Sequence, residues 1–222
     1  FNRFTPLQGG ELKQRIQRLL KGCGFATKGI FVMDGSRRSG HGNAYFPGFG
    51  RNKRIVFFDT LVASLDHDEM EAVLAHELGH YKHRHVLKQL ALGMIATLLG
   101  LALLGWLAGQ HWFYQALGVT LPSNAAALLL FLLVSPVFTQ FLQPLHALIS
   151  RRHEFEADNF AREQSGPEPL IRALVKLYRD NASTLTPDPL YSAFHDSHPP
   201  APLRVARLSC KTGTEPRSTL AQ

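Results

Sequence analysis

A stretch of 62 residues, from Gln89 to Ser150, contains no Asp, Glu, Lys or Arg, and this gap is what most constrains the fold. All 24 basic and 17 acidic side chains of the 222-residue chain lie in the two flanks. Within the gap, two apolar segments are long enough as helices to cross a bilayer core of about 30 Å. We therefore predict a two-helix transmembrane hairpin, with spans at about residues 87–108 and 125–149.

A buried apolar hairpin in a soluble protein is the alternative, but two successive segments of spanning length favour the membrane. The connector between the spans carries Trp112 and Tyr114, which are typical of the membrane interface. Pro136 and Pro144 are predicted to kink the second span.

Basic residues on both sides of the hairpin indicate its orientation. Lys82, Arg84 and Lys88 precede or begin the first span, and Arg151 and Arg152 follow the second. The connector contains neither Lys nor Arg, so both flanks are expected on the cytoplasmic side. We predict a multi-pass integral membrane protein of the bacterial inner membrane or the endoplasmic reticulum membrane.

Composition excludes several other classes. The net charge of +7 is not accompanied by alternating basic and aromatic residues, so no nucleic-acid partner is predicted. Cys23 and Cys210 are too few and too far apart for a disulfide framework or a cysteine zinc site. The chain begins at Phe1 without a Met or a signal peptide, and we expect a fragment whose N-terminus lies upstream.

The flanks combine helices with a few short strands, so the predicted fold class is α+β and mainly helical. Residues 11–21 have the apolar periodicity of an amphipathic helix. Residues 29–34, 43–46 and 54–59 are predicted to form a small antiparallel sheet, and residues 1–10 a loop.

The motif that indicates function is His76-Glu77-Leu78-Gly79-His80. Residues four apart share one face of a helix, so His76 and His80 can bind the same metal ion. Glu77 points about 100° away, which suits a base acting on water at that metal. A chance match in a chain of this length has odds on the order of one per cent. Asp66 and Glu69 are predicted to start the helix as a capping box.

Zinc in a hydrolase takes three protein ligands and keeps one position open. The predicted helix from Arg151 offers Glu154 as the third ligand, and Asp158 on the same face to accept a hydrogen bond from a ligating histidine. Glu156 is a competing carboxylate, although it points away from that face. We predict one Zn²⁺ per chain and a metalloendopeptidase in which Glu77 is the general base.

Two other classes remain as alternatives. A non-catalytic membrane scaffold that binds zinc would not need Glu77 and would usually fill four metal positions. A metal transporter would need ionisable residues inside the spans, where His146 is the one candidate.

The combination of motifs resembles the integral-membrane zinc proteases that include the CAAX prenyl protease type 1 and the heat-shock protease HtpX, and it is closer to the prenyl protease branch. The resemblance is carried by Phe4-Thr-Pro-Leu7, Gly42-Asn-Ala-Tyr-Phe46, Lys53 to Leu61, Ala72 to His80, Ser150 to Asp158, and Ser197-His-Pro-Pro200 with Arg204. Members of the family carry additional membrane helices before this region.

This resemblance implies a gluzincin core with zinc on His76, His80 and Glu154. It further implies that His198 stabilises the oxyanion, with Arg204 as a helper or as a salt bridge to the helix of Asp158. Asn43, Ala44 and Tyr45 would contact the substrate by strand pairing.

The family resemblance also implies two substrate classes. One is a protein with a prenylated CAAX C-terminus, which loses its last three residues, and the other is a damaged or misassembled membrane protein. We accordingly divide the chain into four parts. Residues 1–86 and 150–210 form the catalytic domain, residues 87–149 the hairpin, and residues 211–222 a disordered tail.

Overall fold

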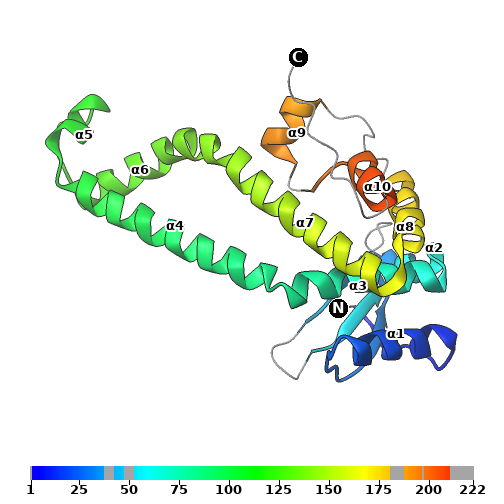
Figure 1. The fold of residues 1–222 in the computed structure, drawn as a ribbon. Coiled ribbons are helices and arrows are strands. Elements are labelled where there is room, and N and C mark those ends of the chain that lie inside the picture. The colour runs from blue at the N-terminus through cyan, green and yellow to red at the C-terminus, as the bar shows by residue number, and fades with distance from the viewer. Residues whose placement is uncertain (1, 38–42, 48–52, 181–187, 197, 211–222) are drawn as a thin grey trace, which may run out of the picture. The chain divides into compact units, whose positions relative to one another are not determined.

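The computed structural model describes residues 2–37, 43–47, 53–180, 188–196 and 198–210, and Figure 1 shows their fold. They divide into two compact units. The first unit comprises the described parts of Phe1–His83, Arg151–Asp188 and His198–Gln222, and the second those of Arg84–Ser150 and Pro189–Ser197. The predicted tail 211–222 lies outside the described residues.

The first unit combines short strands from its N-terminal part with several helices. Its strands are β1 (Phe4–Pro6), β2 (Ile30–Met33), β3 (Ala44–Tyr45) and β4 (Ile55–Phe58). Its helices are α1 (Glu11–Gly22), η1 (Gly35–Arg37), α2 (Asp59–Ser64), α3 (His67–Lys82), the later part of α7 (Gln143–Ser165), α8 (Pro167–Asp180) and α10 (Ala201–Ser209).

The four strands form one sheet in the order β1-β2-β4-β3. β1 is antiparallel to β2, β3 is antiparallel to β4, and β2 is parallel to β4. The predicted purely antiparallel sheet was therefore wrong. After β2 the chain passes to the far edge, forms β3, and returns as β4 into the space between β3 and β2, so β4 runs in the same direction as β2.

The N-terminal segment predicted as a loop contains the edge strand β1. It is only three residues long and ends at Pro6, which has no amide proton to donate. Proline is tolerated in a sheet at such an edge. The strand therefore owes its structure to pairing with β2 rather than to a local pattern.

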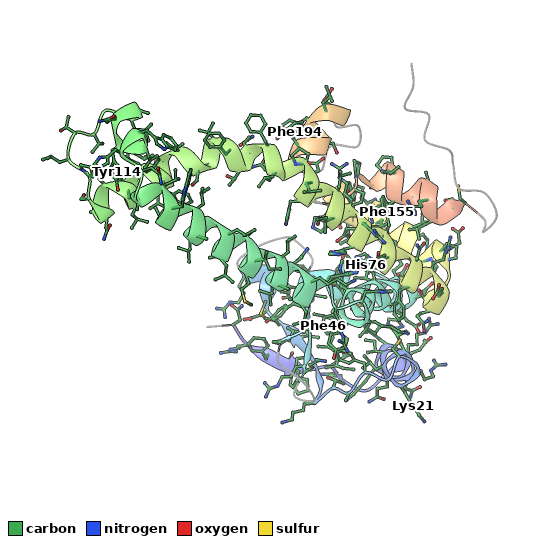
Figure 2. The ribbon with its side chains drawn as sticks, turned by 60° about the vertical axis from the view of Figure 1, so that its left-hand side comes forward. Lys21, Phe46, His76, Tyr114, Phe155 and Phe194 are labelled. Carbon is green, nitrogen blue, oxygen red and sulfur yellow. The ribbon has the colours of Figure 1, made fainter. Side chains whose placement is uncertain are left out.

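The core of the first unit lies among the sheet, α1, α3 and α8. Leu12, Ile16, Leu19 and Leu20 on one face of α1 are buried, as the predicted amphipathic helix requires. α3 packs against both α1 and α8. Figure 2 shows the side chains that fill this unit, with His76 inside it and Lys21 on its surface. The apolar packing thus fixes α3, the helix that carries the His-Glu-Leu-Gly-His motif.

The beginning of α3 confirms the predicted capping box. The Asp66 side chain accepts a hydrogen bond from the backbone at Glu69, and the Glu69 carboxylate accepts one from the Asp66 N–H at 2.9 Å. Two of the free N–H groups at the helix start are thereby satisfied.

Glu69 also binds α3 to α8. Its side chain is completely buried, and one oxygen lies 2.7 Å from Lys176 Nζ while the other lies 3.4 Å from Arg172 Nε. A buried carboxylate is stable only when paired, so these contacts determine where α8 meets the start of α3.

The second unit consists of an apolar helical hairpin and a short helix, α9 (Pro189–His195). The hairpin contains α4 (His85–Ala108), α5 (His111–Ala116), α6 (Asn124–Thr139), η2 (Gln140–Leu142) and the first residues of α7. Two helical stretches, His85–Ala108 and Asn124–Ser165, are long and apolar enough to cross a membrane. The first predicted span coincides with α4, whereas the second is the beginning of a helical stretch that continues through the position of Glu154.

The connector contains the helix α5, which was not predicted from the sequence. Tyr114 of α5 is buried with Phe113 and Leu130, and its hydroxyl donates to the carbonyl of Ala108 at 2.9 Å. Figure 2 shows Tyr114 at the end of the hairpin where α4 and α6 join. This aromatic side chain therefore closes the hairpin turn.

Of the two prolines predicted to kink the second span, Pro136 lies inside α6, which continues to Thr139, whereas Pro144 follows a turn of 3₁₀ helix, η2, between α6 and α7. Pro144 has no N–H to donate to the carbonyl of Gln140, so the regular α-helical pattern cannot continue through this turn.

We predict that Glu69→Ala lowers the free energy of unfolding by about 2–3 kcal/mol. Removing one member of a fully buried pair costs about 3–5 kcal/mol, and Lys176 is partly solvated. Thermal unfolding of the protein in detergent measures the effect. Glu71→Ala is the matched control, because Glu71 is on the same helix and only its partly exposed contact with Arg15 is lost. Equal losses in both variants would contradict a special role for Glu69.

Candidate metal centre

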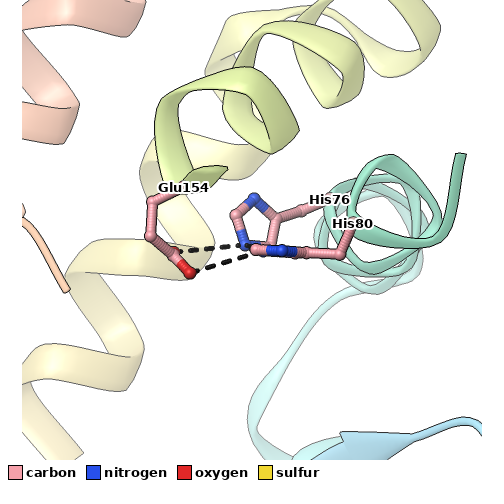
Figure 3. Close-up of side chains that lie close together, drawn as sticks. All are labelled: His76, His80 and Glu154. Atoms are coloured by element: carbon pink, nitrogen blue, oxygen red, sulfur yellow. Dashed lines mark hydrogen bonds and ion pairs between the residues drawn. The ribbon is translucent and has the colours of Figure 1, made fainter. Parts of the chain in front are cut away.

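The two histidines of α3 point their Nε2 atoms to one place, as Figure 3 shows. These atoms are 3.2 Å apart, one helical turn separating the two residues. His76 is buried and His80 is partly exposed, so the centre lies at the boundary between the core and solvent.

Glu154 of α7 meets both histidines. Its Oε2 lies 3.5 Å from His76 Nε2, and its Oε1 lies 3.4 Å from His80 Nε2. Glu156, the competing carboxylate, instead forms a hydrogen bond with Arg152 at 3.0 Å. The structure thus brings together the three residues predicted as ligands, His76, His80 and Glu154.

The spacing of these atoms fits a tetrahedral zinc site. Ligand atoms about 2.0–2.1 Å from a tetrahedral zinc ion lie about 3.3 Å from one another. The two imidazole nitrogens here are 3.2 Å apart, and Glu154 places Oε1 3.4 Å from His80 Nε2 and Oε2 3.5 Å from His76 Nε2. Two imidazoles and one carboxylate are also a donor set typical of catalytic zinc. The residues therefore fit the metal that the motif predicts.

Asp158 contacts His76 at the ring nitrogen that does not face Glu154 and His80. Its Oδ1 lies 2.9 Å from His76 Nδ1, which leaves Nε2 facing Glu154 and His80. A carboxylate that binds the second ring nitrogen of a ligating histidine fixes the orientation of the ring and raises its basicity. The spacing of four residues between Glu154 and Asp158 places both carboxylates on one face of α7, as expected.

Arg204 of α10 forms a salt bridge with Asp158. The buried guanidinium donates from Nη2 to Asp158 Oδ1 at 2.6 Å and from Nε to Asp158 Oδ2 at 2.9 Å. Burial lowers the pKa of Arg204, but the bonds to Asp158 outweigh this effect and raise it. Of the two roles considered for Arg204, the geometry favours the salt bridge to the acidic helix.

The charges around His76 favour its protonated form when no metal is bound. Burial lowers its pKa, but the hydrogen bonds with Asp158 and Glu154 prevail and raise the pKa to about 9. Metal binding must displace this proton, since only neutral imidazole is a ligand. The anionic surroundings of His76 are suited to a divalent cation.

His198 lies against the third predicted ligand. Its Nδ1 is 3.1 Å from Glu154 Oε1, while about two-thirds of its side chain is exposed. The hydrogen bond with Glu154 raises the pKa of His198, which favours a protonated, donating imidazole. Glu77, the predicted base, is partly exposed on α3 between the two ligating histidines.

The predicted substrate residues lie at the free edge of the sheet. Asn43 accepts a hydrogen bond from Phe58 N–H through its backbone carbonyl at 2.9 Å, and so faces β4. Neighbouring residues of a strand face opposite ways, so Ala44 turns its backbone groups to the open edge. The Asn43 side chain accepts a hydrogen bond from the Ala44 N–H at 2.8 Å. Tyr45 follows, paired with Val56.

Tyr178 was not among the predicted site residues. Its hydroxyl donates to the carbonyl of Pro199 at 3.3 Å and so links α8 to the segment next to His198. Nothing in the spacing of Tyr178 within an amphipathic helix distinguishes it from an ordinary core residue, so sequence pattern alone could not have identified it.

The model of the family described as Peptidase family M48 matches residues 6–212. CAAX prenyl protease 1 of Saccharomyces cerevisiae is 40% identical over 229 residues, which cover 94% of this chain and 49% of that protein. CAAX prenyl protease 1 homolog of Arabidopsis thaliana is 37% identical over 219 residues, which cover 98% and 51%.

Among solved structures, the crystal structure of Ste24p from S. mikatae matches with a TM-score of 0.84 and 38% identity. The match covers 95% of this chain and 52% of that chain. The chain thus spans about half the length of the curated relatives it matches. These matches confirm the resemblance seen in the motifs and the mainly helical α+β fold class.

We predict that Asp158→Asn weakens zinc binding by about 10–100-fold, the usual effect of removing a carboxylate that supports a ligating histidine. Competition with a chelator measures the affinity. Glu163→Gln is the matched control, because it removes one carboxylate charge from an exposed position of the same helix. Parent-like zinc affinity in Asp158→Asn would show that Asp158 does not support the metal.

Proposed function

This chain belongs to peptidase family M48, and from that premise we propose that it is an integral-membrane zinc endopeptidase. The observation that carries the proposal is the convergence of His76 Nε2, His80 Nε2 and the Glu154 carboxylate within 3.2–3.5 Å. The relatives named CAAX prenyl protease 1 support the same activity.

The roles of the individual residues follow from their positions. Zinc held by His76, His80 and Glu154 would polarise the scissile carbonyl and lower the pKa of a water molecule. Glu77 takes the proton of the attacking water and passes it to the leaving amine. His198, which lies beside Glu154 and is largely exposed, would donate a hydrogen bond to the oxyanion.

The remaining charged residues keep this arrangement in place. Asp158 directs Nε2 of His76 toward the metal, and Arg204 holds Asp158 through two hydrogen bonds. An intact base beside three ligands argues against the non-catalytic scaffold, since a structural site needs no base.

The substrate is proposed to bind as an additional strand along β3. β3 is at the edge of the sheet, so its outward N–H and C=O groups are available to an extended peptide. Ala44 would supply those backbone groups, while Asn43 and Tyr45 flank it. The Asn43 side chain, which accepts from the Ala44 N–H, would give up this bond to the substrate.

The proposed substrate class is a polypeptide with a prenylated C-terminus, which the names of the relatives support. The proposed location is a membrane crossed by α4 and by the helical stretch Asn124–Ser165, whose lengths and apolar character support insertion. Basic residues at both ends of the hairpin support a cytoplasmic position for the metal centre.

We expect Glu77→Gln to lower kcat/KM by about 10²–10⁴-fold, because it removes the general base but no metal ligand. The assay uses the zinc-loaded protein in detergent with a farnesylated CAAX peptide, beside the same peptide without the lipid. Glu71→Gln on the same helix is the control and should keep full activity.

The outcomes of this assay test both the role of Glu77 as the base and the proposed class of substrate. Loss of activity in Glu77→Gln with zinc retained supports the peptidase mechanism, and preference for the farnesylated peptide supports the substrate class. Equal cleavage of both peptides would instead favour proteolysis of damaged or misassembled membrane proteins. Equal activity of Glu77→Gln and the parent would exclude Glu77 as the base.

Substitution of the edge strand gives a separate test. Ala44→Pro removes one outward N–H without removing a hydrogen bond between β3 and β4, so kcat/KM should fall by about 2–10-fold, the effect of one hydrogen bond. Ala44→Val keeps the N–H and is the control. Zinc affinity should be unchanged in both. If Ala44→Pro cleaves peptides as efficiently as the parent, the substrate does not pair at this position.

A further inference from the structure

The helices α3 and α7 touch at Gly79, where there is no room for a side chain. A methyl group at this position would lie 2.9 Å from Ala157 Cα, 3.2 Å from the Ala157 carbonyl oxygen and 3.1 Å from Phe160 Cβ. Two of these three atoms belong to the backbone of α7. No change of side-chain rotamer can therefore make room for the methyl group.

This contact lies among the predicted metal ligands. Gly79 precedes His80 and follows His76 by three residues, while Ala157 precedes Asp158 and follows Glu154 by three residues. At 1.5 Å per residue, all four of these site residues lie within about 5 Å of the contact along their helix axes. Figure 3 shows Glu154 of α7 pointing toward His76 and His80 of α3. The distances from Glu154 to His76 and His80 therefore depend directly on how far apart α3 and α7 lie.

The conformation of the backbone does not explain the glycine. Gly79 lies inside α3 and is not among the glycines with positive φ in the described part of the chain, which are Gly24, Gly29, Gly118 and Gly166. Within a helix, glycine is less favourable than alanine by about 0.5–1 kcal/mol. Local helix stability would therefore favour alanine, and the close approach of α7 is what opposes it.

The effect of a methyl group at Gly79 on the metal ligands depends on how far α3 and α7 would have to move apart. Carbon atoms in contact are about 3.5–4.0 Å apart, so the helices would have to separate by about 0.5–1 Å. Zinc–ligand distances tolerate only about 0.2 Å. The separation would exceed that tolerance and would pull Glu154 away from His76 and His80.

We infer that Gly79 is a positioning residue for the metal centre: its missing side chain sets the separation of α3 and α7 at which Glu154 can share one metal ion with His76 and His80. Gly79 acts through these ligands and does not touch the metal. The inference rests on the proposed zinc site.

The test is Gly79→Ala in the whole protein, purified in detergent. We expect zinc affinity, measured by chelator competition, to fall at least tenfold. We also expect the visible absorption spectrum of the Co²⁺-substituted protein to change, because it reports the coordination geometry of the ion. Neither measurement depends on peptidase activity.

Two matched variants separate positioning from general effects. Gly22→Ala makes the same substitution at the end of α1, where the methyl group meets no atom within 4 Å. Ala173→Val overpacks the core of the same unit at a fully buried position of α8. Both should bind zinc and Co²⁺ as the parent does.

Each outcome has one meaning. Weakened zinc binding and an altered Co²⁺ spectrum in Gly79→Ala alone support the inference. Parent-like binding, an equal loss in Ala173→Val, or failure of Gly79→Ala to fold would overturn it, since Gly79 would then serve no role or only the fold. Failure of the parent itself to bind zinc would instead refute the proposed function.

Discussion

The contact between α3 and α7 is the constraint on which the proposed metal centre depends. His76 and His80 come before the charge-free segment in sequence, and Glu154 comes after it. The ligands can share an ion only if α7 approaches α3 closely enough for a carboxylate to reach two imidazoles. Gly79 and Ala157 make that approach possible because neither places a bulky side chain between the helices. The centre is thus a property of two helices together and of neither alone.

The buried charges around this contact form a connected set. Asp158 is shared by His76 and Arg204, and Glu154 is shared by both ligating histidines and His198. A buried carboxylate without partners would be destabilising, so Glu154 and Asp158 of α7 each require their cations in place. Arg204 brings α10 into this set, and Glu69 joins α8 to α3 by the same kind of pairing. The folding of the first unit and the order of its metal centre are therefore coupled.

Local patterns in the sequence were enough to predict several of these elements. The four-residue spacing of His76 and His80, the capping box at Asp66 and the apolar face of α1 each depend on neighbours within one or two helical turns. Local spacing could not predict the pairing of Arg204 with Asp158, because 46 residues separate them. The sequence therefore left two roles open for Arg204, and a salt bridge was one of them. The close contact at Gly79 could not be predicted either, because the spacing of residues around a glycine in one helix does not indicate which residue of another helix it contacts. Helix α5 was missed because tertiary packing of Tyr114, rather than amphipathic periodicity, holds it.

The direction of the strands was also predicted wrongly, and it bears on how a substrate can bind. A simple antiparallel meander through β2, β3 and β4 would bury β3 in the middle of the sheet, with both of its edges paired. In the observed order, β4 lies between β2 and β3, and this insertion makes β2 and β4 parallel. It also leaves β3 at the margin, where Ala44 keeps its outward backbone groups. Local patterns could not reveal the parallel pairing of β2 with β4. Because this pairing leaves β3 at the edge, it makes strand addition possible at the residues proposed to bind the peptide.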